Sequence, residues 1–84
     1  MTKGDDKVEE IIEILNELEE DITVPRNVKD KIKIVMNVLK EEVDLKIRIN
    51  KVLHELDEIA DDPNLQPYTR TQIWNVVSML EKVS

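Results

Sequence analysis

Aliphatic residues recur along this 84-residue chain every three or four positions, the spacing that places side chains on one face of an α-helix. The pattern predicts four helices, at about residues 7–20, 26–42, 45–60 and 67–83. The fourth helix starts at either Pro67 or Thr69. The four apolar stripes are expected to form the core: Val8, Ile11, Ile12, Leu15 and Leu18; then Val28, Ile32, Val35, Met36, Leu39 and Val43; then Leu45, Ile49, Val52, Leu53, Leu56, Ile59 and Ala60; and finally Ile73, Val76, Val77, Leu80 and Val83.

Capping and turn residues mark the ends of these segments. Asp6, with a glutamate three positions later, predicts an N-cap for the first helix. Pro25 fits the first position of the second helix, where a missing N–H breaks no bond. The third helix is expected to begin after Asp44, a good N-cap, but only Val43 and Asp44 suggest that break because no Gly or Pro lies there. Residues 61–64 (Asp-Asp-Pro-Asn) predict a turn before the fourth helix.

The two halves of the chain align with each other at one offset, which pairs Asp21 with Asp62 (62 − 21 = 41 residues). The same offset serves both helices of each half and the turn between them. We interpret it as an internal repeat, with one helical hairpin at about 6–42 and a second at about 44–83. The other matched positions are Val8 with Ile49, Ile11 with Val52, Ile12 with Leu53, Leu15 with Leu56, Leu18 with Ile59, Val24 with Leu65, Lys29 with Arg70, Ile32 with Ile73, Val35 with Val76, Met36 with Val77 and Leu39 with Leu80.

Short connections between successive helices favour antiparallel neighbours. The predicted fold class is therefore all-α: a four-helix up-down bundle made of two similar helical hairpins, in one domain spanning residues 1–84. An open layer of two repeats is the alternative. Each half also resembles a HEAT-type helical hairpin of ~40 residues, although such solenoids need three or more units to bury a continuous face. That resemblance implies structural roles at the turns for Asp21, Lys29, Asp62 and Arg70.

Composition agrees with a small aliphatic core. Hydrophobic residues make up 40% of the chain and charged residues 37%, a mixture too apolar for a disordered protein. Tyr68 and Trp74 are the only aromatic residues, so the core must consist of Ile, Leu and Val. The absence of Cys excludes disulfides and thiolate chemistry and fits a reducing compartment. No apolar run approaches the ~20 residues of a membrane span, and no signal peptide is recognised, so we expect a cytoplasmic protein without a membrane partner.

The net charge of −7 disfavours a general nucleic-acid binder, because polyphosphate would repel the molecule as a whole. Acids and bases are nevertheless separated along the chain. Residues 5–21 hold nine acids and one base, whereas residues 26–51 hold eight bases and four acids. A row of bases on the second helix could contact RNA phosphates, but it lacks interleaved aromatic residues for base stacking. We favour charge pairing with the first and third helices for this basic stripe, which comprises Arg26, Lys29, Lys33 and Lys40.

The sequence offers little for catalysis. His54, the only histidine, has Asp57 and Glu58 three and four positions later, a spacing that could touch a divalent ion. Structural metal sites need more converging ligands, and carboxylate-bridged bundles need inward-facing Glu residues. No Ser or Thr has an evident base partner, so we expect no enzyme activity, no metal and no cofactor. A row of acids follows the polar face of the first helix: Glu9, Glu13, Glu17 and Glu20.

Four apolar residues lie off the stripes of their own helices and form the candidate partner surface: Ile34, Val38, Ile47 and Trp74. Apolar residues left outside a thin core favour association. The sequence does not specify a biochemical function. Our interpretation is a non-enzymatic helical protein–protein interaction module, which binds itself as a homodimer or binds an unidentified protein. The alternative is an RNA- or ribosome-associated accessory protein that uses the basic face of the second helix.

Several short motifs carry a resemblance that covers roughly residues 8–82. They are Val-Pro-Arg-Asn at 24–27, Leu-Asp-Glu-Ile at 56–59, Asp-Pro-Asn at 62–64, Thr-Arg-Thr at 69–71 and Ile-Trp at 73–74. On these motifs the chain resembles the archaeal uncharacterised protein family zero-one-four-seven. The resemblance implies a compact four-helix fold and an archaeal cytoplasm. It implies no activity and no catalytic residues.

Overall fold

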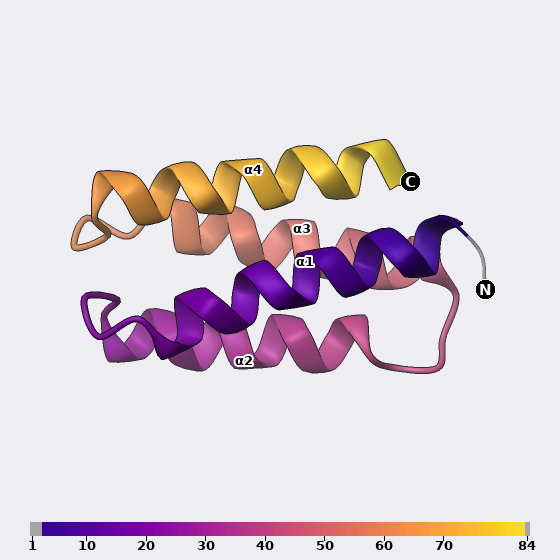
Figure 1. Cartoon of the computed structure of the whole chain (residues 1–84), viewed down its shortest axis with the longest axis horizontal. Coiled ribbons are helices and arrows are strands. Elements are labelled where there is room, and N and C mark those ends of the chain that lie inside the picture. The colour runs from indigo at the N-terminus through magenta and orange to yellow at the C-terminus, as the bar shows by residue number, and fades with distance from the viewer. Residues whose placement is uncertain (1–2, 84) are drawn as a thin grey trace.

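The computed structural model describes the backbone of residues 3–83 and the side chains of residues 7–83. It contains four helices in this part of the chain: α1 (Lys3–Glu20), α2 (Arg26–Leu39), α3 (Leu45–Ala60) and α4 (Pro67–Val83). Residues 3–83 contain no strand, so the prediction of an all-α fold is confirmed. Successive helices run in opposite directions, and both turns within the hairpins lie at the same end of the molecule (Figure 1).

The four helices form a closed ring. Each helix packs against the next one in sequence, and α1 also packs against α4, which joins the first hairpin to the second. The resulting bundle measures 35 × 19 × 17 Å. An open layer of two hairpins would leave α1 and α4 apart, so the closed up-down bundle is the correct alternative.

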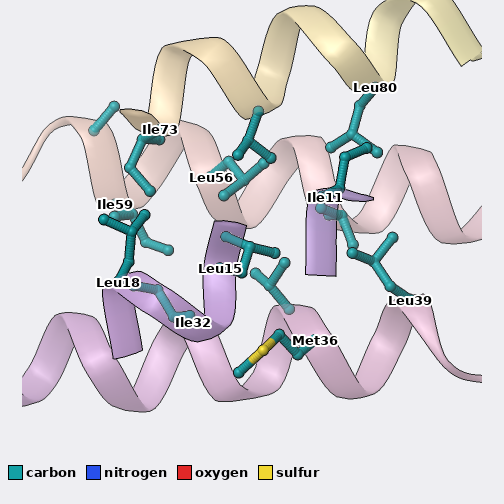
Figure 2. Close-up of a cluster of buried hydrophobic side chains, with 14 of the residues drawn as sticks. Ile11, Leu15, Leu18, Ile32, Met36, Leu39, Leu56, Ile59, Ile73 and Leu80 are labelled. Atoms are coloured by element: carbon teal, nitrogen blue, oxygen red, sulfur yellow. The ribbon is translucent and has the colours of Figure 1, made fainter. Parts of the chain in front are cut away.

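The predicted stripes meet in one aliphatic interior. Side chains from all four helices converge there, among them Leu15, Ile32, Leu56 and Leu80 (Figure 2). Val43 is the exception, because α2 ends before it and its side chain is exposed. The remaining stripe residues that are only partly buried pack against the edge of this core: Ile12, Leu45, Leu53, Val77 and Val83.

Two predicted helix starts differ from the structure. Helix α1 already begins at Lys3, so Asp6 lies within the helix and the predicted N-cap is wrong. Pro25 occupies the N-cap of α2, one position before the predicted N1, with φ −57° and ψ 147°. This extended conformation suits a proline, whose ring fixes φ near −65°, and Arg26 becomes the first helical residue.

The boundary between α2 and α3 is a real break. Helix α2 ends at Leu39 rather than at residue 42, and residues 41–43 form a bend. Asp44 Oδ1 accepts a hydrogen bond of 2.8 Å from the backbone N–H of Lys46, as the predicted N-cap requires. The chain reverses direction within a few residues, so it must leave the helical conformation before it reaches this cap.

The turns within the two hairpins have matching hydrogen bonds. Asp21 Oδ1 accepts bonds from the backbone N–H of Thr23 at 2.8 Å and from its hydroxyl at 2.7 Å. Asp62 Oδ1 accepts a bond of 2.8 Å from the backbone N–H of Asn64. Both are side-chain turns of the type that Asp favours, and each is followed by a buried residue, Val24 or Leu65. The correspondence agrees with the offset of 41 residues, while the internal repeat itself stays a prediction.

Asp62 also ties the second hairpin to the first. Its Oδ2 accepts a 2.9 Å hydrogen bond from Asn27 Nδ2 at the start of α2. Arg70 donates to the carbonyl oxygens of Ala60 at 3.0 Å and Asp62 at 2.9 Å, which satisfies acceptors at the end of α3. The hydrogen bonds from Thr23 are the main cause of a lowered pKa at Asp21, and Lys29, the counterpart of Arg70, adds a smaller electrostatic effect. Asp21, Asp62 and Arg70 thus make hydrogen bonds at the turns, while the HEAT-type resemblance itself stays a prediction.

Acid should weaken the Asp62 turn. The hydrogen bond from the Asn64 backbone lowers the pKa of Asp62 below its usual 3.8, and the bond from Asn27 lowers it further. The ionised carboxylate therefore stabilises the fold above pH 3.8, and this stabilisation is lost as the pH falls from 3.8 through the lower folded-state pKa. Urea unfolding across the acid range should show Asp62→Asn losing most stability near neutral pH, with the gap to wild type narrowing in acid. Asp57→Asn, an exposed change of equal charge, is the control.

Thr69 should be replaceable with a gain in stability. Its side chain is 1% exposed, and Oγ1 has no hydrogen-bond partner among the described residues. A buried hydroxyl without a partner costs about 1–3 kcal/mol, and Val has a similar shape and helix propensity. Thr69→Val should therefore raise the free energy of unfolding by about 1 kcal/mol in urea titrations. Thr71→Val, which removes a hydroxyl that donates to the Pro67 carbonyl at 3.0 Å, should give no gain.

Candidate interaction surface

A shallow groove runs between α2 and α3 on the outside of the bundle. Its volume is about 420 Å³, and its α2 wall is formed by Ile34 and Val38. Ile34 lies off the buried stripe of α2, and its side chain is 51% exposed. Val38 is half-buried and packs against the core from outside. The α3 wall is polar and consists of Asn50, Lys51, His54 and Glu55.

Ile47 extends this apolar surface along α3. It precedes Lys51 by four positions and His54 by seven, so it lies on the same outward side of the helix as these two groove residues. Its side chain is also 51% exposed. We call the surface formed by Ile34, Val38 and Ile47 the α2/α3 face. It brings together three of the four residues predicted for the partner surface.

Trp74 does not join this face. It lies on α4, a helix that packs against α1 and α3, and it is not among the residues that line the groove. Its side chain is 46% exposed. The structure also exposes two apolar residues that the stripe analysis did not single out, Ile22 in the first turn at 92% and Tyr68 at the start of α4. Ile22 was recognisable in the sequence as an aliphatic residue outside every predicted stripe.

The predicted basic stripe is divided in two. Arg26, Lys29 and Lys33 line a hollow beside Glu19 and Asp30 near the start of α2. Lys33 Nζ lies 3.4 Å from Glu19 Oε1 on α1, which is the charge pairing with the first helix that the sequence favoured.

Lys40 lines a different hollow at the other end of α2, together with Glu9 and Glu13 of α1. Both groups of bases therefore face acids of the same molecule.

His54 lines the groove, and its imidazole lies near the carboxylate of Glu58. Its Nε2 lies 3.7 Å from Glu58 Oε1, and both side chains are exposed. Within the described residues no three His, Asp or Glu side chains are grouped closely enough to hold a metal ion. No helix within residues 3–83 has the length and apolar character that a transmembrane segment needs.

An antiparallel ring of four short helices around an aliphatic interior defines the class of compact four-helix bundles. The sequence profile of the Uncharacterised protein family (UPF0147) matches residues 1–83. The chain belongs to this family.

Relatives and solved structures agree with this assignment. A UPF0147 protein of Methanocaldococcus jannaschii is 46% identical over 71 residues, which cover 83% of this chain and 76% of the relative. The crystal structure of a UPF0147 protein from Thermoplasma acidophilum aligns with a TM-score of 0.91 at 35% identity, covering 99% of this chain and 100% of that chain. The crystal structure of the unknown function protein MMP1188 aligns with a TM-score of 0.88 at 42% identity, covering 94% and 91%.

Substitutions on the α2/α3 face should leave the fold intact. Ile47 is half exposed, whereas Ile49 two positions later is fully buried. Ile47→Ala should change the free energy of unfolding by less than about 1 kcal/mol, and Ile49→Ala should lower it by about 2–5 kcal/mol because it leaves a cavity. Chemical denaturation of both variants measures the difference. Equal losses would mean that Ile47 belongs to the core.

Proposed function

We propose that this protein is a non-enzymatic helical interaction module that binds another protein through the α2/α3 face. The observation that supports it is the exposure of two large aliphatic side chains, Ile34 on α2 and Ile47 on α3, together with the partly buried Val38. Burial of apolar surface stabilises an association by about 25 cal/mol per Å². Covering the exposed half of each isoleucine with a partner would therefore contribute favourably to the free energy of binding.

The form of the groove favours a helical partner. Its apolar side chains on α2 lie four positions apart, as on a ridge of a helix surface. A partner helix with apolar residues at three- and four-residue spacing could lay them along such a groove. Lys51 and Glu55 on the opposite wall would form a charged rim, which sets orientation more than affinity.

The chemistry of the described residues supports binding rather than catalysis. Asp21 and Asp62 serve the turns of the two hairpins, where turn N–H groups donate to their carboxylates and lower the pKa of both. A general acid or base needs a carboxyl whose pKa is raised toward neutrality. RNA binding through α2 is the second candidate, but Glu19 and Asp30 stand among the bases that would have to contact phosphate.

The proposal can be tested by comparing which proteins the wild type and its variants retain from a lysate of the source organism. Ile34→Lys places a charge on the α2/α3 face and should abolish retention of the specific partner, because a charge would then be buried in the interface. Ile22→Lys makes the same change at the exposed first turn and should retain the same proteins as wild type. Quantitative mass spectrometry measures the difference.

Two outcomes contradict the proposal. Retention that is identical for wild type and Ile34→Lys would remove the α2/α3 face from any interaction. Retention that disappears after ribonuclease treatment, falls steeply with salt and is lost in Lys29→Glu/Lys33→Glu would replace it with the RNA alternative.

A further inference from the structure

The charges of α3 are segregated along the helix. Its bases, Lys46, Arg48 and Lys51, all lie in the first half, and its acids, Glu55, Asp57 and Glu58, all lie in the second half. No acid occurs in its first turn and no base in its last turn. The helix macrodipole favours the reverse order, with acids at the N-terminus and bases at the C-terminus. The order in α3 therefore opposes the stability of the helix on its own.

Contacts within the chain explain only some of the charged residues in this unfavourable order along α3. Arg48 donates through Nη1 to the Leu39 carbonyl at 2.7 Å and so satisfies an acceptor at the end of α2. Lys51 makes no ion pair with any residue of 7–83, and Glu55, four positions later, makes none either. A Lys that precedes a Glu by four positions is also the weaker orientation for a pair within one helix. Lys51 and Glu55 both line the groove and are open to a partner.

We infer that the partner of the α2/α3 face is a second copy of this chain, related by a twofold axis that sets the two α3 helices antiparallel. This inference rests on the proposed function and names its partner. A twofold axis brings the basic half of one α3 opposite the acidic half of the other, twice in each dimer. A surface with one basic end and one acidic end is thus complementary to itself in this orientation.

The register follows from the positions of the charges. A twofold axis that passes between His54 and Glu55 places Lys51 of each copy opposite Glu58 of the other copy. Within one helix these two residues are seven positions apart, on the same side but separated by about 10 Å, too far to form a pair. Ile34 lines the groove together with His54 and Glu55, so it lies close to the axis. The isoleucines of the two copies would then pack against each other at the centre, inside a charged rim.

Sedimentation equilibrium of the full chain tests the inference, from about 5 µM to about 500 µM, a range that reports dissociation constants typical of small interfaces. Wild type should dimerise within this range. Lys51→Glu and Glu58→Lys should each weaken the dimer at least about tenfold, because either change places like charges opposite each other twice. The double variant Lys51→Glu/Glu58→Lys restores opposite charges and should return the dissociation constant to within about threefold of wild type.

Stability and cross-linking measurements distinguish the loss of the dimer from the misfolding of a variant. Thermal unfolding followed by circular dichroism establishes that each charge variant is folded. The natural chain has no cysteine, so a single introduced thiol is unique. His54→Cys, at the axis, should be linked into dimers by a short bis-maleimide reagent. Glu17→Cys on α1 should not, although its side chain is also exposed.

The outcomes separate this inference from the proposed function. A wild type that stays monomeric at the highest concentration overturns the second copy as partner. The proposed function would still stand if Ile34→Lys alone lost specific proteins from a lysate. A dimer whose double charge variant is as weak as the single variants overturns the antiparallel register of α3. Cross-linking of Glu17→Cys but not of His54→Cys would place the dimer interface on another side of the bundle.

Discussion

The contact between α1 and α4 is the constraint on which the rest of the structure depends. These helices are the first and last of the chain, and their packing joins two hairpins into one closed ring. Closure covers the stripe of each helix on both sides, so residues such as Ile11, Leu15, Ile73 and Leu80 are fully buried. With almost no aromatic side chains available, many interlocking aliphatic contacts must provide the stability that a few large rings provide elsewhere.

A filled aliphatic interior leaves chemistry and recognition to the outer surface. Thr69 is the only polar side chain that is fully buried among the described residues, and it is a single hydroxyl rather than a polar network. Several polar contacts instead lie near the helix ends, where Arg48 donates to the Leu39 carbonyl and Arg70 donates to the carbonyls of Ala60 and Asp62. These contacts fix where each helix begins and ends.

Helix α3 shows how one segment serves both roles. Ile49, Val52 and Leu56 on its inner side are fully buried, whereas Ile47 and Lys51 face outward. Its inner residues follow the requirements of packing, but the order of its charges opposes its own dipole. A charge order that lowers the stability of its own helix is typical of residues that serve a functional surface. This disagreement, together with the exposed Ile34, is why the α2/α3 face carries the proposed association.

The sequence by itself determined four helices, their buried stripes and the Asp44 cap, because helical periodicity and capping are local properties of the chain. It misplaced the end of α2, which stops at Leu39 rather than at residue 42, and the start of α1, which begins at Lys3. Only the tertiary structure decided that Ile34, Val38 and Ile47 share a face while Trp74 does not, and that Lys40 is separated from Lys33. Those outcomes depend on how each helix is rotated about its axis and which helix lies beside it, and both are fixed by packing among residues far apart in the chain.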